Sequence, residues 1–477
     1  MRQLDVINPR SGAVDYRIDA YSGDDVATLL VPVRGSQTAW ARAGVDHRCE
    51  VLGRWAEAID ARRAEIGEAL ATDTGRRSFA FFEVQKALDF IAHWRDRAPA
   101  LMAEYGAGQS QQIPSVHFRH CPVPYPVVGI ISPWNVPLVL ALIDAIPALA
   151  AGCAVLLKPS EVTPRFAAPL AESIAEVPEL AAVFRVVTGG PETGEAVVEH
   201  ADAISFTGSV ATGRKVGEHA ARRFIPAFLE LGGKDPAIVT ASADLDNAAT
   251  AIVRSAIGMT GQACQSLERV YVDRRIFDEF KTRLLDQVTA VELNWPDMRS
   301  GHIGPLIFGK QAETLQLQLD DAVAKGASIL CGGRIEHHGG GKWCLPTVLD
   351  NLSDDMLIMQ EETFGPLIPL LPFDSVDDAI RMANSSEFGL SAAVFSADID
   401  DATAIGERLQ VGAVSINDAG LTAVVNDVEK NSFCLSGIGG SRMGDSGFRR
   451  FLRKRALLIQ TAPALSIDLF REDNRAE

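Results

Sequence analysis

The sequence predicts an α/β protein built on parallel sheets, and three observations lead to that prediction. Short apolar runs alternate with helical segments from residue 127 onward, the pattern of strand–helix–strand units on a parallel sheet. A second alternation of the same kind starts beyond Gly232. The chain has 477 residues, and this length favours about three domain-sized units over one simple core.

Composition narrows the class of protein. The hydrophobic fraction is 47% and the charged fraction 22%, which is ordinary for a globular enzyme. A net charge of −17 disfavours nucleic acid as a partner, because phosphates require a basic surface. The seven cysteines form no CxxC pair and are expected to be reduced thiols. No secretory signal follows the N-terminus, so we expect a cytoplasmic protein, and we expect no metal ion.

Before residue 127 the sequence predicts helices and one short strand. The helices are one capped by Ser22, one over 50–72 that stops at Gly75, and one over 79–104. Val116 and Phe118 alternate with polar residues, which predicts a half-exposed strand ahead of the Pro-rich stretch at 122–126.

The first alternating region predicts a dinucleotide-binding sheet, although the usual G-x-G-x-x-G fingerprint is absent. Its strand-like runs are Val127–Ile131, Ala154–Leu157, Phe184–Val187 and Ala203–Phe206. Helical segments intervene near 138–150, 164–177, 192–200 and 211–221. The apolar stretch from Val136 to Leu157 is long enough to cross a bilayer, but Pro137, Asp144 and Pro147 interrupt it. We therefore expect a buried helix and then a buried strand, with no membrane span.

The second alternating region predicts further strands and helices around a cysteine loop. The predicted elements are a strand over 237–239, a helix over 247–257, a strand over 269–272 and a helix over 276–290. Near the C-terminus an apolar run, Ala456–Ile459, predicts another strand. The basic residues before it are expected on a solvated face; they are Arg449, Arg450, Arg453, Lys454 and Arg455.

Three segments carry residues suited to covalent catalysis. Cys264 stands among small residues in Gly261-Gln262-Ala263-Cys264-Gln265-Ser266, unlike a packed core strand, so its thiolate is a candidate nucleophile. Its charged form then requires nearby dipoles or cations. Glu230 precedes two glycines and is either a general base or a surface carboxylate at a strand end. Asn135 is either a donor to a developing oxyanion or a turn residue.

Other segments suggest a dinucleotide site. Lys158 and Glu161 follow a buried strand at the end where parallel sheets hold ligands. A carboxylate there accepts ribose hydroxyls and repels a 2′-phosphate, which favours NAD over NADP, whereas helix capping by neighbouring residues is the alternative. Gly208-Ser209 begins a glycine-spaced strand-to-helix turn, which matches neither G-x-G-x-x-G nor a P-loop and is weak evidence by itself. Glu362 and Phe364 lie in a Gly/Pro-bounded segment, and the alternative is a loop carboxylate beside a core phenylalanine.

In their order along the chain these segments closely resemble the aldehyde dehydrogenase superfamily. They are Pro133-Trp134-Asn135-Val136-Pro137, Lys158-Pro159-Ser160-Glu161, Phe206-Thr207-Gly208-Ser209, Glu230-Leu231-Gly232-Gly233-Lys234, the cysteine loop, and Glu361-Glu362-Thr363-Phe364-Gly365-Pro366. The resemblance covers about residues 5 to 460. It implies a Rossmann-type cofactor domain, an α/β catalytic domain and a small β oligomerisation element. Their expected bounds are 1–110 with 127–231, then 232–440, and 111–126 with 441–465.

The resemblance also implies the reaction and the roles of the residues. Cys264 would attack an aldehyde, Asn135 would hold the oxyanion, and Glu230 would activate the water that hydrolyses the thioester. The cofactor would be NAD, with NADP less favoured. The implied cofactor-binding residues are Trp134, Lys158, Glu161, Gly208, Ser209, Glu362 and Phe364.

Two positions depart from the family pattern, and three alternatives stay open. Arg442 stands where lysine is common, and Arg449 stands where many members have glutamate, so a proton exit through that glutamate is not expected. The alternatives are an enzyme that transfers the acyl group to coenzyme A, a cofactor-independent thiol esterase, and a non-catalytic binding protein.

The substrate and assembly are predicted less directly. Residues after Asn135 on the expected pocket helix include no cation, which favours an apolar or aromatic aldehyde over one with a second carboxylate. The family resemblance implies a homodimer or homotetramer, with Val116–His120 and Ala456–Gln460 as candidate edge strands.

Overall fold

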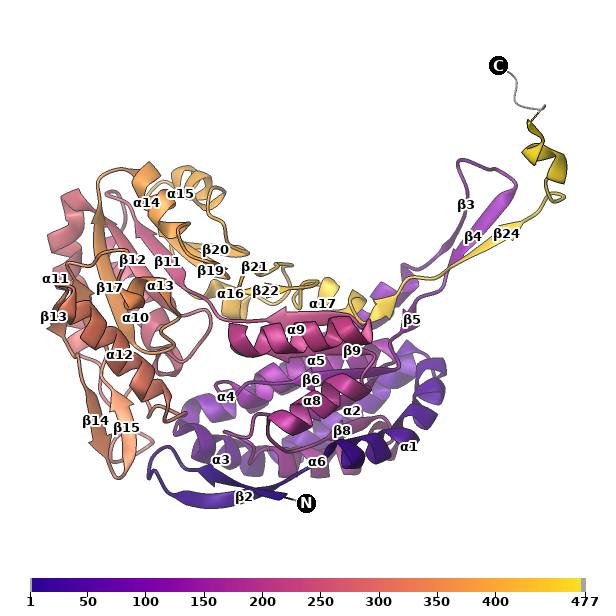
Figure 1. The fold of residues 1–477 in the computed structure, drawn as a ribbon, viewed down its shortest axis with the longest axis horizontal. Helices are drawn as coiled ribbons and strands as arrows, with labels where there is room; N and C mark the ends of the chain where they lie inside the picture. Colours follow the sequence, from indigo (N-terminus) through magenta and orange to yellow (C-terminus); the bar gives the residue numbers. More distant parts are fainter. Residues whose placement is uncertain (1, 473–477) are drawn as a thin grey trace.

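The structure, a computed structural model, describes residues 2–472. Two large, mainly parallel sheets with packed helices stand side by side, and a thin three-stranded arm projects from the body (Figure 1). The predicted α/β architecture is therefore confirmed.

The first large sheet reverses its strand order next to its first strand. Its parallel strands are β6 (Val127–Ile131), β7 (Ala154–Lys158), β8 (Phe184–Val186), β9 (Ala203–Thr207) and β10 (Ala227–Glu230). They lie in the order β8-β7-β6-β9-β10, and β22 (Gly437–Ile438) is added antiparallel at the β10 edge. The order reverses between β6 and β9, and open α/β sheets bind ligands at the carboxyl ends of strands at such a point.

Helices connect these strands and cover the sheet. The connecting helices are α5 (Pro137–Ala151), α6 (Ala167–Ala175), α7 (Pro178–Ala181), α8 (Pro191–His200) and α9 (Val210–Arg223). The apolar stretch that could be mistaken for a membrane span divides into α5 and β7, as predicted. In residues 2–472 no helix combines the length and apolar character that crossing a bilayer requires.

The N-terminal part adds a hairpin and four helices to this half of the molecule. These elements are β1 (Arg2–Ile7), β2 (Val14–Ala20), α1 (Gly23–Arg42), α2 (Val45–Ala61), α3 (Arg63–Thr74) and α4 (Arg77–Ala103). Ser22 caps α1 with a reciprocal bond to Asp25, and α3 ends at Gly75, both as predicted. The helix predicted over 50–72 is instead two helices that meet at Arg62.

The second large sheet has seven strands. They are β11 (Asp235–Val239), β12 (Leu267–Asp273), β13 (Ser328–Cys331), β16 (Thr347–Asp350), β17 (Leu367–Phe373), β19 (Ser391–Phe395) and β20 (Ala413–Ile416). Their order is β13-β16-β17-β12-β11-β19-β20, and only β13 is antiparallel to its neighbour.

Helices and short strand pairs complete the second half. The helices are α10 (Leu245–Ile257), α11 (Phe277–Thr289), α12 (Gln311–Ala324), α13 (Leu357–Gln360), α14 (Val376–Ala383), α15 (Ile399–Gly406) and α16 (Leu421–Val424). The strand pairs are β14 (Ile335–His338) with β15 (Gly341–Cys344), and β18 (Phe388–Gly389) with β21 (Phe433–Cys434). The cysteine loop joins α10 to β12, so it lies between elements of the second sheet.

The arm brings together segments from far apart in the sequence. It consists of β3 (Ala107–Gln109), β4 (Val116–His120) and β24 (Ala456–Gln460). At its base β5 (Val123–Pro124) pairs with β23 (Leu452–Arg453), close to the short helix α17 (Ser446–Arg449). The strands predicted near 116–118 and over 456–459 are confirmed, and the arm points away from both large sheets (Figure 1).

Candidate active site

A cleft of about 1170 Å³ lies at the switch point of the first sheet. It is lined by the segments that follow β6, β7 and β9, together with parts of the second half of the chain. Nine of the ten residues predicted for the site line it: Trp134, Asn135, Lys158, Glu161, Gly208, Ser209, Cys264, Glu362 and Phe364. Glu230 is the exception. The residues that the sequence analysis singled out for the site therefore gather in this cleft, with the exception of Glu230.

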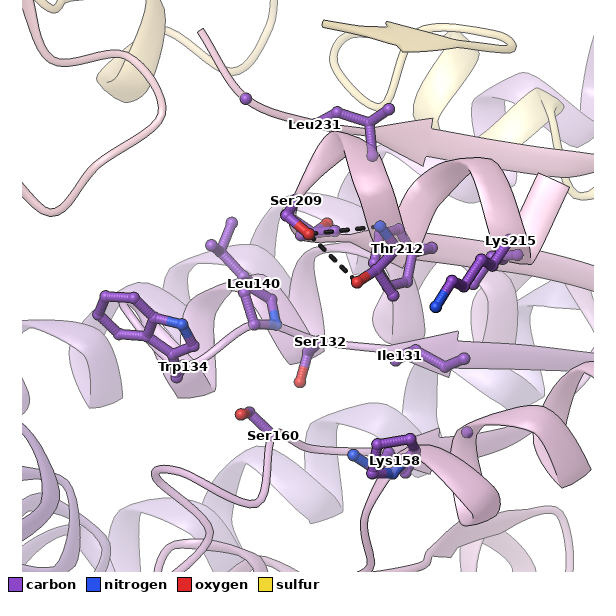
Figure 2. A pocket seen from close by; sticks show the side chains of 18 of the residues that line it. Ile131, Ser132, Trp134, Leu140, Lys158, Ser160, Ser209, Thr212, Lys215 and Leu231 are labelled. Carbon is purple, nitrogen blue, oxygen red and sulfur yellow. Dashed lines mark hydrogen bonds between the residues drawn. The ribbon is translucent and has the colours of Figure 1, made fainter. Parts of the chain in front are cut away.

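The N-terminus of α9 faces this cleft. Ser209 caps the helix, accepting a hydrogen bond from the backbone N–H of Thr212 at 3.4 Å (Figure 2). Lys215, one turn further along α9, also lines the cleft. Free backbone N–H groups, the positive end of the helix dipole and an ammonium group suit a pyrophosphate.

Lys158 and Glu161 form an ion pair at the end of β7. Lys158 Nζ donates to Glu161 Oε2 at 2.7 Å, and the lysine side chain is buried. The pair places a cation next to the carboxylate that was expected to repel a 2′-phosphate. The argument for NAD over NADP from Glu161 is therefore weaker than the sequence alone suggests.

The cysteine loop has an unusual backbone. Met259, Thr260 and Gly261 are all left-handed, with φ of 51°, 60° and 70°. A Cβ on Gly261 would lie 2.3 Å from the carbonyl carbon of Gly365, so only glycine permits this close approach. The two non-glycine residues are costly in this conformation, as is common where backbone is held for function. Cys264 follows and is partly exposed to the cleft.

The charges around Cys264 hold its thiol neutral in this state. Burial, followed by the carboxylates of Glu362 and Asp235, raises the pKa of Cys264 to about 12, and Lys430 is the cation that opposes them. The sequence predicted surroundings that favour the thiolate, and this prediction is wrong for the structure described. The thiolate can therefore form in one of two ways. Bound substrate and cofactor change these surroundings, or a base accepts the proton of the thiol.

Glu362 lies directly against the backbone that follows β10. Its Oε1 accepts a hydrogen bond from Gly233 N at 3.1 Å, and a Cβ on Gly232 would lie 2.6 Å from its Oε2. Burial raises the pKa of Glu362 to about 8. Phe364 packs edge-on against Trp134, with ring centroids 5.3 Å apart. These contacts place the predicted cofactor residues around one end of the cleft, next to Cys264.

Asn135 connects the start of α5 to the cysteine loop. Its Nδ2 donates to the carbonyl of Gln262 at 2.9 Å, and Arg76 Nη2 donates to the carbonyl of Asn135 at 2.9 Å. The carboxamide is thus buried beside the nucleophile's loop, where an oxyanion donor is needed, and one of its two N–H groups is held by a protein acceptor.

Glu230 lies outside the cleft lining, at the carboxyl end of β10. Its Oε2 accepts a hydrogen bond from Ser432 Oγ at 2.8 Å. It remains close enough to raise the pKa of Cys264 through its charge. The structure thus brings Glu230 near the cysteine but does not place it in contact with it.

Glu268, which the sequence did not single out, supports the cofactor side of the site. Its carboxylate accepts hydrogen bonds from Lys234 Nζ at 2.9 Å and from the backbone N–H groups of Thr363 and Phe364 at 2.8 Å each. Both Glu268 and Lys234 are buried. This buried ion pair fixes the segment that carries Glu362. A charged residue inside the apolar strand β12 was the only signal in the sequence.

Arg442 and Arg450 share one buried carboxylate. Arg442 Nη2 donates to Asp144 Oδ2 at 2.7 Å and to Thr207 Oγ1 at 2.8 Å, and Arg450 pairs with the other oxygen of Asp144. The prediction that the whole basic cluster lies on a solvated face is wrong for Arg450, whose side chain is only 3% exposed. Arg449 does lie at the surface, paired with Glu104.

The parallel sheet with a cleft at its switch point and a cysteine loop beside it is the architecture of an α/β oxidoreductase. A model of the "Aldehyde dehydrogenase family" matches residues 1–457, and the chain belongs to that family.

Relatives agree with this assignment. A protein of Mycolicibacterium smegmatis named "Putative succinate-semialdehyde dehydrogenase, NADP(+)" is 34% identical over 94% of this chain and 86% of its own. The chloroplastic betaine aldehyde dehydrogenase of Amaranthus hypochondriacus is 35% identical over 87% of this chain and 85% of its own. A solved structure, "Putative Aldehyde Dehydrogenase PutA from Anabaena variabilis", has a TM-score of 0.95 at 47% identity, covering 98% of this chain and 99% of the other.

Proposed function

We propose that the protein oxidises an aldehyde to a carboxylic acid through a covalent thioester on Cys264. Membership of the family supports NAD(P)-linked aldehyde oxidation. The observation that carries the finer assignment is the position of Cys264. It opens onto a cleft with a phosphate-binding helix end, next to the carboxamide of Asn135 and within electrostatic reach of Glu230.

In the first step, Sγ of the Cys264 thiolate adds to the carbonyl carbon of the aldehyde. The oxygen becomes an oxyanion, which the Asn135 carboxamide and the backbone N–H of Cys264 stabilise. The Gln262 carbonyl accepts one N–H of Asn135 Nδ2, which leaves the second N–H to donate to the oxyanion. Loss of one such donor typically costs about 100- to 1,000-fold in rate. A bound nicotinamide would accept the hydride that leaves the substrate carbon, so that the oxyanion collapses to the carbonyl of a thioester on Cys264.

In the second step, water hydrolyses the thioester. Glu230 accepts the proton of the attacking water, and Cys264 leaves as a thiolate. Ser432 donates to Oε2 of Glu230, which leaves the other carboxylate oxygen to accept from the water. Glu230 favours hydrolysis over transfer to coenzyme A, since transfer needs no base for water.

The cleft fits NAD(P). Its volume, the capped end of α9 and Lys215 suit the pyrophosphate, while Lys158 and Glu161 suit the adenosine ribose. We propose NAD as the preferred cofactor because Glu161 can accept both ribose hydroxyls. The Lys158 pairing and the NADP(+) in the name of the mycobacterial relative make NADP the alternative to be tested.

The test is steady-state formation of reduced dinucleotide with a panel of aldehydes, using NAD and NADP and with or without coenzyme A. We expect turnover without coenzyme A, a higher kcat/KM with NAD, and the loss of several orders of magnitude in Cys264→Ala, which should still bind dinucleotide. Strict dependence on coenzyme A would contradict hydrolysis. Ester cleavage without dinucleotide binding would support the esterase alternative.

We also propose the division into domains that the family resemblance implied. Core residues from 26–101 and 127–231 form one hydrophobic cluster, which supports a cofactor domain split in sequence. Two other clusters cover the faces of the second sheet and support the catalytic domain at 232–440. The oligomerisation element at 111–126 and 441–465 contains the arm, although Met443, Phe448, Phe451 and Leu452 pack into the first cluster. The cytoplasmic location stays a prediction.

The names of the relatives leave the substrate open. Succinate semialdehyde carries a negative charge and betaine aldehyde a positive one, and relatives with both names are about equally similar to this chain. The preference for an apolar or aromatic aldehyde rests on the residues of α5 alone and stays a prediction.

A further inference from the structure

The helix α5 begins directly after the proposed oxyanion donor but has no cap of its own. Asn135 stands two residues before the helix, and neither Val136 at the N-cap nor Pro137 at the first helical position has a side chain that accepts hydrogen bonds. The free N–H groups at a helix start need acceptors, so another element has to supply them. That element is α4, which packs against α5.

Glu83 on α4 caps α5 from outside. Its Oε2 accepts hydrogen bonds from the backbone N–H groups of Leu138 at 2.9 Å and Val139 at 3.2 Å, the second and third residues of α5. The side chain is buried, and burial raises the pKa of Glu83 to about 7. A carboxylate is stabilised next to the positive end of a helix. Glu83 thus fixes the position at which α5 starts.

Arg76 holds the residue that precedes the helix. It stands seven residues before Glu83, two turns away, so the two side chains lie on the same side of α4. Arg76 Nη2 donates to the carbonyl of Asn135 at 2.9 Å. This bond engages only the backbone of Asn135 and leaves its carboxamide free for other partners. The two residues of α4 therefore hold the chain on both sides of Val136.

Arg76 is a buried cation with few partners. Within the described part of the chain, its Nε and Nη1 have no hydrogen-bond partner, and its remaining contact is with the ring of Phe79, 5.4 Å from Cζ. Burial lowers the pKa of Arg76 to about 10, and the charge of Glu83 opposes this effect. A buried charge with so few bonds costs free energy. Residues that break such a rule are expected at functional sites.

Contacts around Arg76 close a ring that includes the cysteine loop. A Cβ on Gly304 would lie 2.6 Å from Arg76 Cγ, so the arginine stem lies directly against this glycine. The backbone N–H and carbonyl of Gly304 both bond to Oγ1 of Thr260, at 3.1 Å each, and Thr260 belongs to the cysteine loop. In the same loop the carbonyl of Gln262 accepts from Asn135 Nδ2. The ring ties the proposed oxyanion donor to the loop of the nucleophile.

We propose that Arg76 and Glu83 are positioning residues for the oxyanion donor. Arg76 holds the backbone of Asn135 and Glu83 holds the first turn of α5, so that Asn135 presents its second Nδ2 N–H to the oxyanion. Neither is among the described residues that line the cleft, so both act through Asn135. The inference rests on the proposed aldehyde oxidation. A displacement of about 1 Å can cost about 100-fold in rate, so holding the donor in place has a large effect.

A double-mutant cycle tests whether Arg76 acts through Asn135. The kcat, the KM for the best aldehyde of the panel and the affinity for NADH are measured for wild type, Arg76→Met, Asn135→Ala and the double variant. Methionine keeps an apolar stem against Gly304 and removes every donor, and Glu83 can bind a proton once the cation is gone.

We expect Arg76→Met to lower kcat by about 10- to 100-fold, with the KM and the affinity for NADH unchanged, because a misplaced donor weakens binding of the transition state alone. In the Asn135→Ala background the same change should alter kcat by less than about twofold, because residues that act as a unit are not additive.

Arg48→Met is the matched control, because Arg48 is a similar arginine at the other end of α5. It is buried and donates to backbone carbonyls, among them that of Ala150 in α5 at 2.9 Å. Its replacement should leave kcat unchanged, even where it lowers the free energy of unfolding. Equal losses of kcat from Arg76→Met with and without the Asn135 side chain would overturn the inference, as would an Arg76→Met protein with the wild-type kcat.

A second pair of variants makes the same comparison at Glu83, which covers an Arg76→Met protein that fails to bind NADH. Glu83→Gln keeps an oxygen that accepts from Leu138 and Val139, whereas Glu83→Leu does not. We expect kcat to be about tenfold lower for Glu83→Leu than for Glu83→Gln, and this difference should vanish with Asn135→Ala. Equal kcat values for the two would overturn the inference. A wild-type protein that oxidises no aldehyde would instead contradict the proposed function.

Discussion

Cys264 and Glu362 have protonation states that depend on each other. Burial raises the pKa of Glu362 to about 8 and, with the Glu362 charge, that of Cys264 to about 12. Below pH about 8 the Glu362 carboxyl is neutral and does not repel a thiolate. Above that pH it ionises and makes the thiolate harder to form. Above pH about 8 the charge on Glu362 thus opposes formation of the Cys264 thiolate.

This coupling predicts how the alkylation of Cys264 depends on pH. In Glu362→Gln the repulsion is absent, so iodoacetamide should label Cys264 faster than in wild type at pH about 9, by up to about tenfold for each unit by which the thiol pKa falls. At pH about 7, where Glu362 is already protonated, the two rates should be similar. Labelling is measured without dinucleotide.

The neighbouring Glu361→Gln is the control for this measurement, because Glu361 is exposed. It should behave like wild type at both pH values. Equal rates for Glu362→Gln and wild type at the higher pH would disprove the coupling.

At the scale of single residues, the sequence indicated some of the residues of the site and not others. Cys264, Asn135 and Glu362 stand in segments whose glycine and proline residues are visible in the sequence, and the cleft contains all three. Glu268 and Lys430 gave no such signal, because their partners become neighbours only through folding. The state of the thiol was also wrongly predicted, since burial and carboxylates from other segments, Glu362 and Asp235, raise its pKa.

The strands of the first sheet were predictable because they are mostly apolar, as buried parallel strands are. The β1–β2 hairpin was missed because it buries only Val6 and Ile18 and so carries little hydrophobic pattern. The break at Arg62 was missed because apolar residues continue on both sides of it. Pattern thus predicts elements that carry a continuous or alternating apolar run and misses those, such as the hairpin, that bury only one side chain per strand.

The segment from Glu362 to Phe364 depends on a buried ion pair, which gives a prediction on stability. Glu268→Ala leaves the Lys234 ammonium buried without its carboxylate and two backbone N–H groups without an acceptor. We expect the free energy of unfolding to fall by about 3 to 5 kcal/mol. Urea unfolding followed by tryptophan fluorescence measures the change.

Glu279→Ala removes an exposed carboxylate that pairs with Arg283 one turn away on α11, and it should cost less than about 1 kcal/mol. A Glu268→Ala protein as stable as Glu279→Ala would show that the buried pair does not hold this segment.

The arm exposes apolar side chains on its edge strand. Leu457, Leu458 and Ile459 on the edge strand β24 are 45%, 73% and 50% exposed. Edge strands with apolar side chains are sites of association, and the family resemblance implies a dimer or tetramer. We propose that the arm contacts a second copy of the chain.

Charge on the arm should therefore dissociate the assembly. Leu458→Asp is expected to sediment as a monomer at concentrations where wild type is a dimer or tetramer, as measured by sedimentation velocity. Val31→Asp, which changes an equally exposed residue of α1, should keep the wild-type assembly. Wild type that sediments as a monomer, or a Leu458→Asp protein that assembles normally, would contradict this role of the arm.

The whole account depends on the covalent bond between Cys264 and the substrate, and mass spectrometry of Glu230→Gln tests it most directly. Mixed with an aldehyde and dinucleotide, this variant should release one equivalent of reduced dinucleotide and then stop, because no base activates water. The denatured protein should carry the acyl group on the peptide that contains Cys264, and Cys264→Ala should carry none. An inactive Glu230→Gln protein with an unmodified Cys264, or with the acyl group on another residue, would contradict the mechanism.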